Sequence, residues 1–177
     1  QTVCPPAFGY DVYVDMDVPG NDLGGGGPLV FADPRSYCNA DAQCSGYVTV
    51  TSYVTNPDVF PYIGNSFFKA ATSPTSDYQG LCLYVKKPGD QTVCPPVSGY
   101  DVYVDTDVPG DDLLGDGPIP FDDPRSFCED DPDCNGYVQI ISHANAANIG
   151  SSVLKVATSP KSDVQGFCLY VKVLREF

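Results

Sequence analysis

The chain contains two copies of one sequence, and this repeat constrains its fold more than any other feature. QTVCPP begins at Gln1 and again at Gln91, and GYDVYVD, DVPG, DPRS and GYV recur at the same offset of 90 residues. ATSP and CLYVK then recur at an offset of 86 residues, so the second copy is four residues shorter. Self-similarity of this kind predicts two modules with the same fold. We expect module one at residues 1–87, a linker at 88–90 that contains the breakers Pro88 and Gly89, and module two at 91–177.

Each module carries four cysteines at corresponding positions. The chain has no CxxC pair and one histidine, His143, whereas structural zinc sites combine closely spaced Cys and His residues. We therefore favour disulfide bonds over a metal. Four cysteines allow three pairings, and we favour the one that joins the two ends of the module and staples a helix to the next strand. These pairs are Cys4–Cys82 and Cys38–Cys44, with Cys94–Cys168 and Cys128–Cys134 in module two.

A disulfide framework predicts an extracellular protein, secreted or at the cell surface, because disulfides persist in oxidising compartments. No signal peptide precedes Gln1, so we expect the mature form of the chain or a part of a longer one. The 23 acidic and 9 basic residues give a formal net charge of -14, which argues against nucleic acid as a partner because phosphates would not be neutralised. No stretch approaches the roughly 20 apolar residues of a membrane-spanning helix.

The residue pattern of each module predicts strands around one short helix. Alternation from Tyr10 to Asp15 indicates a half-buried strand. Asp33 followed by Pro34 is typical of a helix start, which predicts a helix over 34–41 and its copy over 124–131. Further strands are expected at 47–54, 67–69 and 81–86, the last with its odd and even positions on opposite faces. A module of about 88 residues is marginally stable alone, so two disulfides per module would stabilise this antiparallel α+β unit.

Each module resembles a PAN/apple-type domain. The resemblance rests on an N-terminal cysteine before a strand, a short helix that carries a cysteine, CSGYV at Cys44–Val48 and GLCLYVK at Gly80–Lys86. DVPGNDL at Asp17–Leu23 and FFKAATSP at Phe67–Pro74 are similar to segments of PAN/apple-like repeats in secreted and cell-surface proteins of green algae and related eukaryotes. The resemblance covers nearly all of both modules, with four cysteines in place of the six of the full apple pattern. It implies a curled antiparallel sheet of about five strands crossed by one helix, and a role in adhesion or assembly without catalysis.

The aspartate-rich turn after the first strand is a weak candidate for a calcium site. An EF-hand loop needs an acidic residue at its twelfth position, which is Gly26 in module one and Asp116 in module two. We therefore favour a turn in which the aspartates accept hydrogen bonds from backbone amides, and we expect no metal or cofactor. The calcium candidates in module two are Asp105, Asp107, Asp112 and Asp116; the corresponding turn of module one contains Asp15, Asp17, Gly20 and Asp22.

The sequence contains no recognisable catalytic constellation. His143 has no counterpart in module one, and we expect it to be solvated. The GGGG segment at 24–27 lacks the lysine and the helix pattern of a phosphate loop and becomes LGDG in module two, so we expect a surface loop there. With no Ser–His–Asp arrangement and no cysteine left unpaired, we expect no enzymatic activity.

Several residues are candidates for modification by sugars. No Asn-x-Ser/Thr sequon is present, which excludes N-linked glycan on the usual rule. Small hydroxyl clusters beside prolines are candidates for O-linked glycan, and two proline pairs are candidates for hydroxylation and glycosylation; the alternative is that these are ordinary turn residues. The candidates are Thr72, Ser73, Thr75, Ser76, Thr158, Ser159, Pro5, Pro6, Pro95 and Pro96.

The two copies differ most at 56–63, where module one has the apolar NPDVFPYI and module two a shorter, blander segment. Large apolar residues on a loop indicate a contact surface, so Val59, Phe60, Tyr62 and Ile63 are candidates for contact with another copy; alternatively, they fold back over their own core. Repeated heterologous contacts give rings or open filaments. We expect an extracellular structural protein that self-assembles into a fibril or surface coat. The alternative function is a monomeric carbohydrate-binding or adhesion module of the cell surface.

Overall fold

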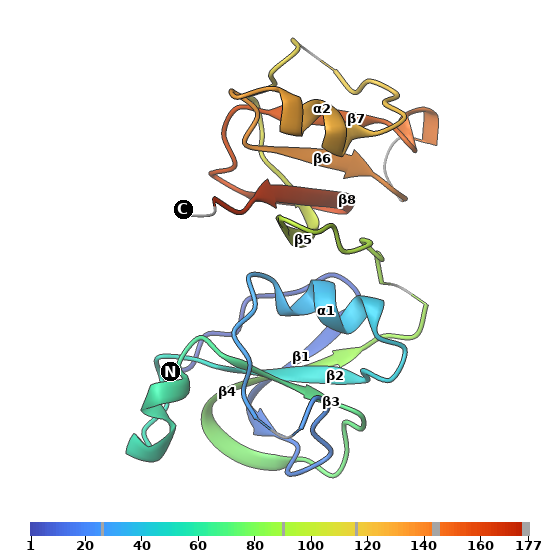
Figure 1. Ribbon diagram of the computed structural model, residues 1–177. Helices are drawn as coiled ribbons and strands as arrows, with labels where there is room; N and C mark the ends of the chain where they lie inside the picture. Colours follow the sequence, from blue (N-terminus) through green and yellow to red (C-terminus); the bar gives the residue numbers. More distant parts are fainter. Residues whose placement is uncertain (26, 90, 116, 143–145, 175–177) are drawn as a thin grey trace. The chain divides into compact units, whose positions relative to one another are not determined.

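The computed structural model describes residues 1–25, 27–89, 91–115, 117–142 and 146–174 (Figure 1). The chain divides into two compact units, Gln1–Gln91 and Thr92–Phe177, which we call module one and module two. The division assigns Gln91, which we expected at the start of module two, to module one. The side-chain amide of Gln91 donates hydrogen bonds to the carbonyl oxygens of Gly9, at 2.9 Å, and of Lys87.

Module one is a four-stranded antiparallel sheet with one short α-helix and one 3-10 helix. The strands lie in the order β1-β4-β2-β3, and Figure 1 shows α1 lying across the sheet. The helical segments are α1 (Pro34–Ala40) and η1 (Pro57–Tyr62), and the strands are β1 (Tyr10–Asp17), β2 (Gly46–Val50), β3 (Ser66–Lys69) and β4 (Ser76–Lys86).

Module two repeats this arrangement element by element, with the strand order β5-β8-β6-β7. Its helical segments are α2 (Pro124–Asp130) and η2 (Ala146–Asn148), and its strands are β5 (Tyr100–Asp107), β6 (Gly136–Ile140), β7 (Ser152–Lys155) and β8 (Ser162–Lys172). The predicted fold class, two tandem antiparallel α+β modules stapled by disulfides, is confirmed.

The sheets differ from the expected one in strand number and in strand length. Each has four strands rather than about five, because the segment before the helix reaches the edge strand β3 only through isolated bridges, Asp22 to Lys69 and Leu29 to Ser66. The second strand ends at Val50, not at residue 54, since Thr51 turns back and its hydroxyl donates to the carbonyl oxygen of Gly80 at 2.6 Å. Conversely, β4 begins at residue 76 and is longer than the expected strand at 81–86.

The sheet of module one is curled by a matched pair of backbone irregularities. The register between β1 and β4 shifts between Val14 and Met16, and Asp15 at this bulge has a φ of 55°. In β4, Gly80 has a φ of 85°, and its amide donates a hydrogen bond of 2.8 Å to Oδ1 of Asp15. A side chain at Gly80 would meet the backbone of Val54, with its Cβ 2.2 Å from the amide nitrogen. Bulges of this kind bend a strand and increase its twist, and β4 curves strongly in Figure 1.

Each face of the sheet carries a hydrophobic cluster. The face toward α1 is aromatic, with Tyr10, Tyr47, Phe68 and Tyr84 packed around the disulfides. The opposite face is covered by an aliphatic cluster, which comprises Val18, Val48, Val50, Val54, Leu81 and Leu83. The alternation expected for residues 81–86 is therefore confirmed, because Leu81 and Leu83 lie in one cluster and Cys82 and Tyr84 in the other.

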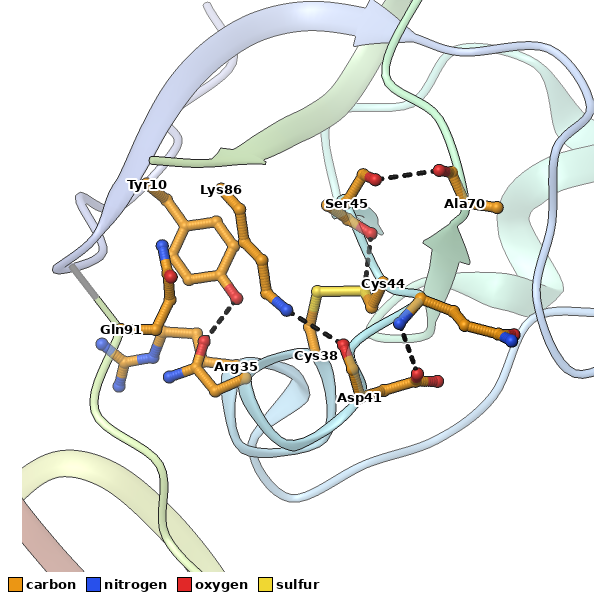
Figure 2. The surroundings of a disulfide bond; sticks show 12 residues. Tyr10, Arg35, Cys38, Asp41, Cys44, Ser45, Ala70, Lys86 and Gln91 are labelled. Carbon is orange, nitrogen blue, oxygen red and sulfur yellow. Dashed lines mark hydrogen bonds between the residues drawn. A yellow bond between two sulfur atoms is a disulfide. The ribbon is translucent and has the colours of Figure 1, made fainter. Parts of the chain in front are cut away.

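The disulfides are Cys4–Cys82, Cys38–Cys44, Cys94–Cys168 and Cys128–Cys134, which are the pairs favoured from the sequence. The Cys38–Cys44 bond joins the end of α1 to the start of β2 (Figure 2). Close by, Nζ of Lys86 donates to the carbonyl oxygen of Asp41 at 3.1 Å, which satisfies a backbone acceptor just past the helix. A glycine is required at position 46, the first residue of β2, because a Cβ there would lie 2.3 Å from the carbonyl oxygen of Tyr84.

Candidate functional site

Module one contains a buried lysine, Lys69, which is the last residue of the edge strand β3. The side chain of Lys69 is 3% exposed. Its ammonium group donates to the carbonyl oxygens of Val18, at 2.7 Å, and Gly20, at 3.3 Å, and to Oδ1 of Asp22 at 2.5 Å. Asp17 lies within ion-pair distance, at 3.6 Å. An ammonium group has three hydrogen atoms to donate, so this set of oxygens satisfies it.

The turn between Asp17 and Asp22 is shaped to surround that ammonium group. Oδ1 of Asp17 accepts a hydrogen bond of 2.7 Å from the amide of Val18, the next residue. Gly20 and Asn21 have φ values of 73° and 56°, a left-handed pair that reverses the chain. The carbonyl oxygens and the two carboxylates therefore converge on one point, as they would around a bound cation.

Module two builds the same centre around Lys155. Its ammonium group lies 2.7 Å from the carbonyl oxygen of Val108, 2.5 Å from Oδ1 of Asp112 and 3.5 Å from Oδ1 of Asp107. Asp105, the remaining described calcium candidate, instead accepts hydrogen bonds from the hydroxyl of Thr92 at 2.6 Å and the amide of Gly166 at 2.8 Å.

The calcium candidates of module two therefore do not converge on a shared metal position in the described part of the chain. Asp107 and Asp112 bind an internal lysine, and Asp105 binds backbone and Thr92 at a different place. Asp116 lies outside the described residues. No group of three or more His, Cys, Asp or Glu residues that the structure describes is arranged to hold a metal ion.

Sequence reasoning did not find the two buried lysines. Within each module the lysine is more than 40 residues from the turn that binds it, and no local motif links them. The signal that was present is the repeat itself, because Lys69 and Lys155 occupy the same position at the offset of 86 residues. A charged residue retained in a short apolar strand indicates a buried partner.

A pocket of about 230 Å³ lies beside the lysine centre of module one. Its polar end is formed by the turn and its lysine, with Asp17, Gly20, Asp22 and Lys69. Its walls are apolar and come from the aliphatic face of the sheet and from η1; they comprise Val50, Val59, Tyr62, Phe67, Tyr78 and Leu81.

The η1 segment both closes this pocket and carries exposed apolar side chains. Asn56 caps it: Oδ1 accepts from the amide of Asp58 at 3.0 Å, and Nδ2 donates to the hydroxyl of Tyr78 at 3.0 Å. Of the four candidate contact residues, Val59 is half-buried against the aliphatic core, as the fold-back alternative expected. Phe60, Tyr62 and Ile63 are 48%, 41% and 43% exposed.

The candidate modification residues lie at three kinds of position. Thr72 and Thr158 are half-buried, and their methyl groups lie close to Gly46 and Gly136. Ser73, Thr75 and Ser76 of module one and Ser159 of module two are exposed. Ser76 is the first residue of β4, whereas we expected it in a loop. Pro5, Pro6, Pro95 and Pro96 are exposed as well.

A shallow hollow of about 390 Å³ adjoins the hydroxyl cluster of module one. Thr72 and Thr75 line it together with the exposed ring of Tyr13 and the apolar side chains of Met16, Leu83 and Val85. In module two, Lys161 stands at the position of Thr75, and its ammonium group lies 4.7 Å from the ring centroid of Tyr103, the counterpart of Tyr13.

The clearest pKa shifts belong to buried tyrosines and not to a cluster of acids. Burial raises the pKa of Tyr47 well above its usual value, and burial also raises the pKa of Tyr84 and Tyr137. Burial raises the pKa of Tyr170 to about 12. These phenols are structural: the hydroxyls of Tyr84 and Tyr170 each donate a hydrogen bond of 2.9 Å, to the carbonyl oxygens of Pro5 and Pro95.

The remaining predicted features contribute no site. Gly24 and Gly25 are exposed, whereas Gly26 and His143 lie outside the described residues. In the described part of the chain, no helix has the length and apolar character needed to cross a membrane. A scan against protein-family models and a search of curated proteins found no match to this chain.

Proposed function

We propose that this chain is a secreted structural protein that self-assembles, as the repeating subunit of a fibril or surface coat. The four disulfides are typical of extracellular proteins and support the location. The observation that carries the proposal is the apolar tip of η1, because Phe60, Tyr62 and Ile63 are exposed together on a segment that is four residues longer in module one than in module two.

The apolar tip of η1 leads to open assembly when its partner is a different surface of the next chain. Contact between two η1 tips would be isologous and would close a dimer, whereas contact with another surface, such as the edge of the sheet, would not. Contacts between two different surfaces are heterologous, and they propagate into rings or filaments. This is the geometry expected of a fibril subunit.

A second surface of module one supports the same proposal. The strand β1 lies at the edge of its sheet, and Val14 on this strand is 47% exposed, whereas the counterpart Val104 on β5 is buried. An edge strand presents unpaired backbone groups that another chain can pair with. We infer that β1 and the η1 tip together form the contact surface of module one.

Light scattering and negative-stain electron microscopy of the full chain test this proposal. We expect concentration-dependent assembly, lost in the double variant Phe60→Ser/Ile63→Ser. The matched control is Ile149→Ser, which changes the counterpart of Ile63 in module two, where Ile149 is 51% exposed. Assembly that survives the double variant unchanged, or a wild-type chain that stays monomeric at high concentration, would contradict the proposal.

We also propose that O-linked sugar is attached to the exposed hydroxyl residues of module one. Thr75 lies at the edge of the hollow that contains the Tyr13 ring, and a sugar there would cover apolar surface that Lys161 partly covers in module two. Intact mass spectrometry of native material would detect such sugar as mass beyond that of the oxidised chain. A mass that matches the unmodified chain would exclude it.

A monomeric carbohydrate-binding or adhesion module is the alternative, and the same hollow is the observation that favours it. Sugar rings stack on exposed aromatic side chains such as Tyr13, and the hollow is open and apolar. Binding on a glycan array by a chain that stays monomeric, lost in Tyr13→Ala, would favour this function over assembly.

A further inference from the structure

The pocket beside Lys69 combines a charged end with aromatic walls, and neither the disulfide framework nor assembly requires this combination. Its volume of about 230 Å³ is below the roughly 300–1,000 Å³ of pockets for drug-sized ligands. It therefore suits a small compound. Three of its lining side chains, Tyr62, Phe67 and Tyr78, are aromatic.

The charged end has a surplus of negative charge. Two carboxylates, Asp17 and Asp22, face one ammonium group, so the centre carries a formal charge of one negative unit. The ammonium group of Lys69 is committed to oxygens of Val18, Gly20 and Asp22. It is therefore not free to bind an anionic ligand.

The carboxylates keep capacity to accept hydrogen bonds from a ligand. Their side chains are 24% and 22% exposed, and each uses Oδ1 for the lysine. A carboxylate has about four acceptor positions, so Asp17 and Asp22 retain acceptors that Lys69 does not occupy. The polar end thus offers acceptors and negative charge, which complement a cation.

The aromatic walls favour the same kind of ligand. Aromatic faces attract a cation that lies within about 6 Å of the ring centroid. This ring environment already holds one cation, because Nζ of Lys69 lies 5.6 Å from the centroid of Phe67. Tyr62 and Tyr78 provide two further rings, and Val59 and Leu81 provide apolar contact for a hydrocarbon body.

We propose that this pocket of module one binds a small organic ammonium compound, whose cationic head lies toward Asp17 and Asp22 and whose apolar body contacts Tyr62 and Tyr78. The proposal goes beyond assembly and does not depend on it. Module two keeps the charged centre but has Val153 and Val164 where module one has Phe67 and Tyr78, and Asn148 in place of Tyr62. The site therefore belongs to module one.

Isothermal titration calorimetry of the full chain with a charged and a neutral ligand tests the charge requirement. The method measures binding whether the sample is monomeric or assembled, so the result does not depend on self-assembly. The probe is choline, and the control ligand is 3,3-dimethylbutan-1-ol, which has the same shape without the charge. We expect choline to bind with about one site per chain and at least about tenfold more tightly than the neutral compound. Equal affinities, two equivalent sites per chain, or no saturable binding of choline would overturn the proposal.

Two variants test the location. Tyr62→Ala and Tyr78→Val, the second of which introduces the residue of module two, should each weaken choline binding by about tenfold. Phe60→Ser is the matched control because Phe60 lies on the same 3-10 helix but does not line the pocket. Choline affinity that is unchanged in both tyrosine variants would overturn the proposal. Loss of assembly in Phe60→Ser with choline binding retained would separate this site from the assembly surface.

Discussion

The ammonium group of Lys69 lies 2.5 Å from Oδ1 of Asp22, a residue 47 positions earlier in the chain. This contact fixes the aspartate-rich turn against the edge strand β3, where Asp22 and Lys69 also form an isolated bridge. The oxygen atoms of this turn thus bind a cation that belongs to the chain itself.

Replacement of the buried ammonium group should destabilise module one strongly. Lys69→Met keeps much of the side-chain volume but leaves Asp17 and Asp22 without their cation, so we expect a loss of about 3–5 kcal/mol in the free energy of unfolding. Urea denaturation followed by tyrosine fluorescence measures it. The control is Lys87→Met, because Lys87 forms only an exposed ion pair with Asp11, worth below about 1 kcal/mol. Similar losses in the two variants would contradict this role of Lys69.

The hydroxyl of Tyr10 should matter more than that of its counterpart Tyr100. Tyr10 donates a hydrogen bond of 2.6 Å to Oδ1 of Asn39. The residue in the place of Asn39 is Glu129, which pairs with Arg125, and the buried hydroxyl of Tyr100 has no hydrogen-bond partner among the described residues. We expect Tyr10→Phe to cost about 1 kcal/mol and Tyr100→Phe to be nearly neutral. Thermal denaturation of the two variants would show the difference, and equal costs would be evidence against it.

The two disulfides of a module should contribute unequally. Cys4–Cys82 spans 78 residues and Cys38–Cys44 spans 6, and the loop-closure model assigns them about 4.5 and about 2.4 kcal/mol. We expect the Cys4→Ala/Cys82→Ala variant to lose more stability toward urea than the Cys38→Ala/Cys44→Ala variant. The reverse order would mean that the short staple acts through the folded state, by holding α1 on β2.

Stability should fall steeply at alkaline pH because buried tyrosines resist ionisation. Burial raises the pKa of Tyr170 to about 12 from its ordinary value of 10.0, so the folded state keeps a proton that the unfolded state releases. The stabilisation is complete below pH 10 and is lost as the pH rises from 10 to 12. Absorbance at 295 nm should show a late-titrating fraction that coincides with unfolding. Complete ionisation of all tyrosines near pH 10 in folded protein would contradict this expectation.

Much of the fold followed from local pattern. The repeat implied two copies of one structure, the Asp33–Pro34 pair marked the start of α1, and alternation assigned residues 81–86 to two faces. Strand ends were predicted less well. The strand β2 ends at Val50 because the hydroxyl of Thr51 donates a hydrogen bond to the carbonyl oxygen of Gly80. The residues around Thr51 do not indicate this contact, because Gly80 lies 29 residues further along the chain.

Residue identity and spacing were sufficient to predict the duplication, the disulfide framework and the segment in which the two copies differ. What the acidic turn binds became known from the three-dimensional structure, because the ammonium group of Lys69 comes from a strand that is 47 residues away from Asp22 in the chain. The same is true of the η1 residues, because Val59 is half-buried against the core whereas its neighbour Phe60 is exposed. Burial and ion pairing are properties of neighbours in space, and a repeat in sequence does not reveal them.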